Sequence, residues 1–230
     1  MTIALVVKVN DGYVLASDSA TTVTEHTPQG QVSVQNIYNN ANKIFNLHKG
    51  LPISAMTWGQ GNVGPASIST LAKDFRVRLT SGDPAWKIKP DNYTMTEVAT
   101  RFKKFFYDEH YKPFAKARQQ NGEPIDSLGL SVAGYSSGAD QPEIFHLDLA
   151  PTGCTGPAEI LVDTPGAQWW GQGEAIVRLL NGVSYSTPEA LKILKLATDD
   201  AEALAVTNDI INQMRLASSD RPCPSRMRST

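Results

Sequence analysis

Two short apolar segments separated by a tight turn open the chain. Residues 3–9 and 13–18 are rich in residues that favour strands, and the Asn-Asp-Gly turn at 10–12 lies between them. An Asp-Gly pair between such segments is a strong signal for a β-hairpin. Because the second strand of a hairpin returns antiparallel to the first, its end lies beside the start of the chain. We therefore expect Asp18 to lie close to Thr2.

Further strand pairs follow the first one along the chain. We expect hairpins at Lys43–His48 with Pro52–Trp58 and at Leu128–Tyr135 with Glu143–Leu149, and one more short strand at Glu159–Val162. The polar segment Thr21–Ala41, rich in Asn, Gln, Thr and Gly, is predicted to be a long surface loop.

Helical periodicity is grouped in two places rather than alternating with the strands. One helix is expected around Ile68–Leu79, and a second begins at a capping box from Thr94 to Glu97. The second helix carries three phenylalanines, which could line a cofactor but are more typical of a helix packed on a sheet. Two later helices are expected at about Glu174–Asn181 and Pro188–Met214.

Grouped hairpins and grouped helices favour antiparallel sheets with helices stacked on their outer faces. The sequence therefore predicts the α+β class. We expect residues 1–216 to form one domain and residues 217–230, which have no periodicity, to form a disordered tail.

Composition excludes several classes of function. The 230 residues are 41% hydrophobic and 19% charged, with a formal net charge of -2, so basic and acidic residues balance and a nucleic-acid partner is not indicated. No apolar run approaches the length of a signal peptide core or of a membrane span. The two cysteines and four histidines show no metal-ligand spacing. These features favour a cytoplasmic protein without a metal or cofactor.

The threonine behind the initiator methionine is the first candidate for chemistry. Removal of Met1 would leave Thr2 with both a hydroxyl and a free α-amine, a nucleophile that carries its own base. Position 2 alone is weak evidence, since many chains begin with Met-Thr. Lys43 opens the second hairpin between a polar segment and an apolar strand, where a lysine is usually only a solvated strand end.

In the order and spacing of these segments, the chain resembles the β-subunit of the proteasome and its bacterial relatives, the N-terminal nucleophile (Ntn) hydrolases. The resemblance covers roughly residues 2–215, and its opening motifs are the specific ones. The matching segments are Thr2, Asp11–Ser19, Asn42–Phe45, Ser54–Gly61, Ser131–Ser136 and Pro142–Phe145.

The resemblance implies an αββα sandwich and a threonine-type peptidase. Thr2 would attack the scissile carbonyl and its amine would shuttle the proton, while Lys43 would lower the pKa of that amine from its ordinary ~7.7–8.0. Asp18 would hold Lys43, and the Gly59 amide would stabilise the oxyanion. Met56 and Thr57 would line the specificity pocket. No metal or cofactor is implied; the implied partners are peptide or unfolded protein substrates, other copies in a ring or spiral, and an ATPase unfoldase.

The chain also departs from the family pattern. The connection from Asp18 to Lys43 is long, Ala20 stands where many relatives have arginine, and Gly171-Gln172-Gly173 replaces a turn that carries serine. The strands that the family has after its last helix are not indicated in this sequence. We therefore expect either a C-terminally truncated member or a sheet edge that another chain covers. These departures leave two alternatives open: a catalytically inactive scaffold or assembly subunit, and an Ntn hydrolase of small amides.

One further motif resembles a nucleotide-binding sequence without its structural context. The segment from Gly59 to Gly64 spells G-x-G-x-x-G between a strand and a helix, as in dinucleotide-binding proteins. That site also requires a parallel strand after the helix, whereas a second helix is expected here. A nucleotide cofactor is therefore not predicted.

Overall fold

The computed structural model describes residues 2–26, 32–81 and 83–219, which fall into two compact units, residues 1–171 and residues 172 onward. The last described helix runs to Ser219, past the predicted domain end at 216. The rest of the predicted tail, residues 220–230, lies outside the described residues. The assignment of residues 1–216 to one domain stays a prediction.

The first hairpin forms as predicted and joins a three-stranded antiparallel sheet. β1 (Ile3–Val9) is central, with β2 (Gly12–Ser17) on one side and β12 (Gly166–Gly171) on the other. Ala4 pairs with Ser17, so the end of β2 lies beside the start of β1. Strand β12 was not predicted, because its six residues are bounded by glycines and contain no β-branched side chain.

The second sheet has five strands in the order β11-β10-β9-β6-β5, all antiparallel. Its strands are β5 (Ile44–Asn46), β6 (Ser54–Gly59), β9 (Leu128–Gly134), β10 (Glu143–Ala150) and β11 (Gly153–Ile160). The predicted hairpins are present, and β11 begins earlier than the short strand expected at 159–162. A small hairpin, β7 (Asn62–Val63) with β8 (Ala66–Ser67), follows β6.

The segment predicted as a loop between Thr21 and Ala41 is instead a β-hairpin. β3 (Thr21–His26) pairs antiparallel with β4 (Val32–Tyr38), and its turn at 27–31 lies outside the described residues. A backbone hydrogen bond of 2.9 Å from Ala41 to Ser19 closes the base of this hairpin. The prediction was wrong because threonine and valine, which favour strands, alternate within a segment whose overall polarity suggested a loop.

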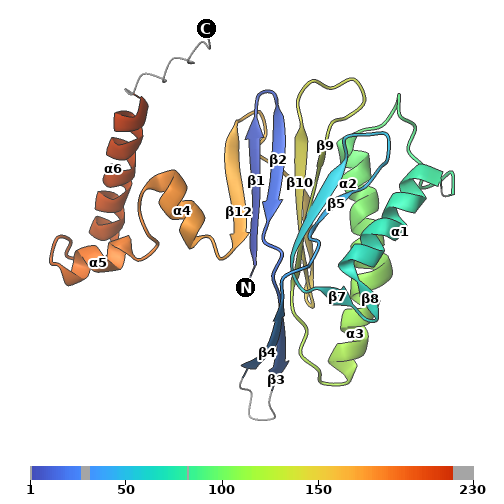
Figure 1. Ribbon diagram of the computed structural model, residues 1–230, viewed down its shortest axis with the longest axis horizontal. Helices are drawn as coiled ribbons and strands as arrows, with labels where there is room; N and C mark the ends of the chain where they lie inside the picture. The colour runs from blue at the N-terminus through green and yellow to red at the C-terminus, as the bar shows by residue number, and fades with distance from the viewer. Residues whose placement is uncertain (1, 27–31, 82, 220–230) are drawn as a thin grey trace, which may run out of the picture. The chain divides into compact units, whose positions relative to one another are not determined.

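Three helices cover one face of the five-stranded sheet (Figure 1). α1 (Ile68–Ser81) and α2 (Met95–Lys103) lie near the predicted positions, and the Thr94 side chain accepts a hydrogen bond from the Glu97 amide as its N-cap. A π-helical stretch, η1 (Lys104–Tyr111), then leads into α3 (Lys112–Gln120), with an i→i−5 bond from Lys112 to the Tyr107 carbonyl. Pro113 follows at once and cannot donate the next helical bond.

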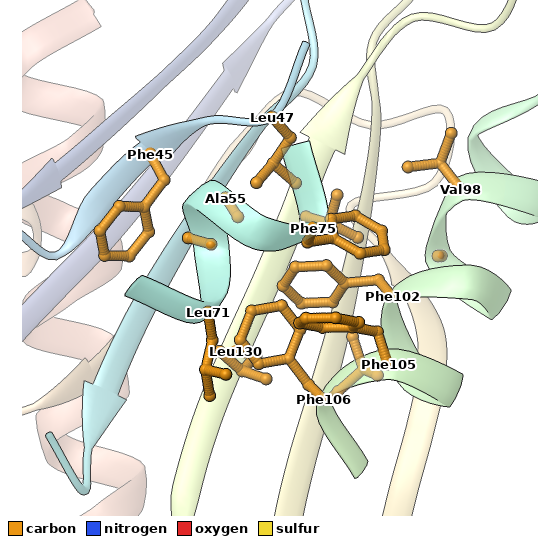
Figure 2. Close-up of a cluster of buried hydrophobic side chains, with 14 of the residues drawn as sticks. Phe45, Leu47, Ala55, Leu71, Phe75, Val98, Phe102, Phe105, Phe106 and Leu130 are labelled. Atoms are coloured by element: carbon orange, nitrogen blue, oxygen red, sulfur yellow. The ribbon is translucent and has the colours of Figure 1, made fainter. Parts of the chain in front are cut away.

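The core between these helices and the sheet is aromatic (Figure 2). Phe75 of α1 packs edge-on against Phe102 of α2 with ring centroids 5.3 Å apart, and Phe102 lies 4.4 Å from Phe106. Phe102, Phe105 and Phe106 are each 1% exposed. The phenylalanine pattern therefore belongs to the core, as predicted.

The other face of the five-stranded sheet packs against the three-stranded sheet. Val6 of β1 forms a buried cluster with Ala133 and Ile144. The Tyr13 hydroxyl lies 2.8 Å from Ser54 Oγ, which ties β2 to β6. Residues 1–171 thus form three layers, helices and two antiparallel sheets, which confirms the mixed α+β class.

An aromatic stack also joins the two sheets, and a glycine makes room for it. The Trp58 ring of β6 stacks on Trp170 of β12 with centroids 4.3 Å apart. A Cβ at Gly129, opposite Trp58 on β9, would lie 2.0 Å from Trp58 Nε1. The stack therefore requires glycine at position 129.

We expect Gly129→Ala to lower the free energy of unfolding by about 1–3 kcal/mol, because Trp58 must leave its packed position. Gly61→Ala is the matched control, since no heavy atom lies within 4 Å of a Cβ at Gly61. Urea unfolding followed by tryptophan fluorescence measures both. Equal stability of the two variants would contradict this role for Gly129.

Residues 172–219 form three helices. α4 (Glu174–Asn181) is as predicted, but the helix expected over 188–214 is two, α5 (Thr187–Ile193) and α6 (Asp200–Ser219). A new helix starts here because the Asp199 side chain caps it by accepting a hydrogen bond from the Glu202 amide. The Glu202 side chain in turn accepts one from the Thr198 amide. Among the described helices, none combines the length and apolarity needed to cross a membrane.

Candidate active site

Three predicted residues meet at the ends of their strands. Thr2 directly precedes β1, Asp18 directly follows β2, and Lys43 directly precedes β5. Lys43 Nζ lies 3.3 Å from Thr2 Oγ1 and 3.0 Å from Asp18 Oδ1. The Lys43 side chain is 10% exposed and that of Asp18 is 26% exposed. The ammonium group is thus held between the hydroxyl and the carboxylate and is largely shielded from water.

Asp18 organises the start of β1 as well as the lysine. Its Oδ1 accepts a 2.8 Å hydrogen bond from the Ile3 amide, and its Oδ2 accepts one of 3.0 Å from the Ala20 amide. Burial alone would raise the pKa of this carboxyl, but the hydrogen bonds from Ile3, Lys43 and Ala20 outweigh it and hold the pKa below its ordinary value of 3.8. The carboxylate is therefore charged at neutral pH.

This lowered pKa predicts how stability depends on pH. A carboxyl with a lowered pKa in the folded state stabilises the fold above its ordinary pKa, and this contribution is lost as the pH falls through the folded value. We expect Asp18→Asn to be less stable than wild type at neutral pH, and the difference to shrink only below about pH 4. Urea unfolding over that range, with Asp11→Asn in the exposed first turn as control, measures the effect. A difference independent of pH would contradict it.

Gly59, the predicted oxyanion donor, ends β6 in a conformation that favours glycine. Its φ is +83°, and a Cβ there would lie 2.4 Å from the Ser127 carbonyl oxygen. Amide directions alternate along an antiparallel strand. The Gln60 amide donates to the Ser127 carbonyl, on the side of β6 that faces β9. The Thr57 amide donates to the Lys43 carbonyl, on the side that faces β5. By this alternation the Gly59 amide faces the side of Lys43, beyond the start of β5.

A cavity of about 750 Å³ lies at this site. Thr2, Lys43, Thr57 and Gly59 all contribute to its wall. Met56, predicted to line the specificity pocket, does not: it is fully buried. The expectation failed because neighbouring residues on a strand point to opposite faces.

Sequence reasoning missed another part of the wall of this cavity. It is formed by Phe114 and Arg118 of α3 and by Pro124 and Asp126 of the following loop. These residues come from the weakly patterned middle of the chain, and only their i, i+4 spacing on one helix hinted that Phe114 and Arg118 share a face.

Thr2 has a glycine as its neighbour on the third strand. Ile3 pairs with Gly171 of β12, and a Cβ at Gly171 would lie 2.0 Å from the Thr2 carbonyl oxygen. Gly171 offers no side-chain hydroxyl to the nucleophile. Within the described residues, no group of three or more His, Cys, Asp or Glu side chains is arranged to hold a metal ion.

Comparisons with known proteins find similarity among solved structures only. No protein-family model matches the chain, and no curated protein matches it significantly. Among solved structures, the chain is similar to Anbu, an ancestral beta-subunit, from Yersinia bercovieri, with a TM-score of 0.47 and 16% sequence identity. The match covers 80% of this chain and 66% of that chain, so this chain spans about two thirds of that structure. Catalytic roles for Thr2, Asp18, Lys43 and Gly59 stay predictions.

Proposed function

We propose that the protein is a threonine-type peptide hydrolase whose nucleophile is Thr2 after release of Met1. The observation that carries the proposal is the position of Lys43 Nζ, 3.3 Å from Thr2 Oγ1 and 3.0 Å from Asp18 Oδ1. A hydroxyl in contact with a shielded cation is poised to act as a nucleophile once a base lies beside it.

In this mechanism the free α-amine of Thr2 is the base. It takes the proton from Oγ1 as the oxygen attacks the substrate carbonyl, and it returns the proton to the leaving amine. The Lys43 ammonium lowers the pKa of the α-amine by like-charge repulsion, so that more of the amine is unprotonated at neutral pH. Asp18 holds Lys43 in place. The amine then activates a water that hydrolyses the ester to Thr2.

Stabilisation of the oxyanion is assigned to the Gly59 amide. This amide faces the side of Lys43 and opens on the cavity that Thr2 lines. A backbone donor at this position is fixed before the substrate binds, and the loss of such a donor typically costs about 2.7–4 kcal/mol of transition-state stabilisation.

The assembly is proposed from the resemblance. We expect the complete fold to be an αββα sandwich. We further expect several copies to form a ring or open spiral in the cytoplasm, with unfolded protein as substrate and an ATPase unfoldase as partner. Sedimentation of the purified protein tests the oligomeric part.

A second candidate function is a catalytically inactive scaffold or assembly subunit. It is favoured by Gly171, which lies against the Thr2 backbone where the family pattern has a serine-bearing turn. Turnover of fluorogenic peptides by the purified protein separates the candidates. Turnover supports the peptidase, turnover confined to small amides supports an amidase, and assembly without turnover supports the scaffold.

A further inference from the structure

The cavity that Thr2 lines has a second basic group in its wall besides Lys43, namely Arg118 of α3. We propose that Arg118 binds a carboxylate of the substrate, so that the cavity selects peptides with an acidic side chain or a free C-terminal carboxylate close to the scissile bond. This inference adds a substrate preference to the proposed function and rests on that function for its relevance to catalysis. The binding itself can be tested without catalysis.

Arg118 is positioned by its own helix. Phe114 lies one turn earlier on α3, and the Arg118 guanidinium carbon lies 5.6 Å from the centre of its ring. An aromatic ring at this distance holds a guanidinium in place and leaves its edge available for hydrogen bonds. Because a guanidinium stays charged at all ordinary pH values and can bind a carboxylate through two parallel bonds, arginine is the residue best suited to this task.

Of the two cations that line the cavity, Lys43 and Arg118, Arg118 has the more exposed acidic partner. The other cation on the wall, Lys43, is paired at 3.0 Å with Asp18, a carboxylate held by two backbone amides. Arg118 is paired at 3.1 Å with Glu123, whose side chain is 44% exposed. An exposed pair contributes little to stability, so a substrate carboxylate can compete with Glu123 for the guanidinium.

Two residues that line the cavity, Gln60 and Arg118, carry unsatisfied polar atoms, which point to a polar ligand. Among the described residues, Arg118 Nε and Gln60 Oε1 are buried and have no hydrogen-bond partner. The Gln60 amide nitrogen donates to the Asn62 carbonyl at 2.6 Å, which leaves its oxygen turned away as an acceptor. A peptide with a carboxylate and a backbone N–H offers the partners that a donor and an acceptor require, once these side chains adjust.

One group on the wall opposes this selection. Asp126 is exposed and contributes to the same cavity, so its charge weakens the attraction for a carboxylate. Removal of the Asp126 charge should therefore strengthen the binding of a carboxylate, whereas removal of the Arg118 charge should weaken it.

The test of binding uses the Thr2→Ala variant, which cannot turn over the substrate. Anisotropy of a labelled, end-capped hexapeptide containing glutamate is compared with that of the same peptide containing glutamine, and with the glutamine peptide bearing a free C-terminus. We expect the capped glutamate peptide or the free-carboxylate peptide to bind about 10- to 100-fold more tightly than the capped glutamine peptide. Whichever of the two shows the effect identifies the source of the carboxylate.

Variants in the same background assign the effect to Arg118. Arg118→Gln should abolish the preference for the carboxylate, and Asp126→Asn should increase it. Circular dichroism confirms that the variants fold. Equal binding of all three peptides, or a preference that survives Arg118→Gln, would overturn the inference.

The inference and the proposed function fail in different ways. Failure of Thr2 to react with a small neutral electrophile in wild type would count against the proposed function and leave the binding result intact. Reaction of Thr2 together with equal binding of charged and neutral peptides would count against the role of Arg118 alone.

Discussion

Replacement of Thr2 by alanine is expected to abolish peptide hydrolysis. The substitution removes Oγ1, which is the only atom proposed to form a bond with the substrate, and loss of a catalytic nucleophile lowers kcat by a factor on the order of 10⁴ to 10⁶. The Thr2 hydroxyl contacts Lys43 at 3.3 Å, and the ion pair of Lys43 with Asp18 does not depend on it. We therefore expect Thr2→Ala to fold normally. Initial rates on fluorogenic peptides, with the folded state checked by circular dichroism, measure the effect.

Thr2→Ser is the matched control for this variant. It keeps a hydroxyl on the residue that carries the free amine, so turnover should remain measurable. Turnover by Thr2→Ala equal to that of wild type would remove Thr2 from the mechanism and assign any activity to another site.

Replacement of Lys43 by methionine is expected to reduce the rate at neutral pH by about 10²- to 10⁴-fold. Methionine preserves much of the length and volume of the side chain but removes the charge 3.3 Å from Thr2 Oγ1. Without that charge, the pKa of the α-amine returns toward its ordinary ~7.7–8.0, so less of the base is unprotonated at neutral pH. The rate of Lys43→Met should therefore recover partly as the pH is raised above about 8.

A pH–rate profile separates this role from a structural one. If Lys43 merely held the fold together, its loss would lower the rate by the same factor at every pH. Lys43→Arg keeps the charge on a larger and planar group. Its pH–rate profile should therefore be displaced less from that of wild type than the profile of Lys43→Met. A profile for Lys43→Met parallel to that of wild type would contradict the proposed effect on the amine.

The parts of the fold that the sequence predicted well are those set by local rules. The Asp-Gly turn at 10–12 fixes the hairpin of β1 and β2, and the Thr94 cap fixes the start of α2. The parts it missed depend on partners far away in the chain. Strand β12 is recognisable only once β1 supplies its hydrogen bonds and Trp58 supplies a ring for Trp170. The hairpin of β3 and β4 was missed because its polarity outweighed its β-branched residues.

The candidate site divides in the same way. Asp18 could be placed beside Thr2 from the antiparallel return alone, and the hydrogen bond from the Asp18 amide to the Ile3 carbonyl agrees with that placement. The approach of Lys43 could not be derived from periodicity; it came from the resemblance, since β5 belongs to the other sheet. Arg118 and Phe114 could not be placed at all, because only the packing of α3 brings them to the cavity.

The most direct test of the account is the mass of the intact protein before and after treatment with a β-lactone, an electrophile that esterifies N-terminal threonine. We expect the purified protein to lack Met1, and we expect the lactone to add once per chain, with fragmentation placing the adduct on Thr2 in wild type and no adduct in Thr2→Ala. Retention of Met1, or its absence without any adduct on Thr2, would contradict the claim that Lys43 and Asp18 prepare a free threonine for catalysis.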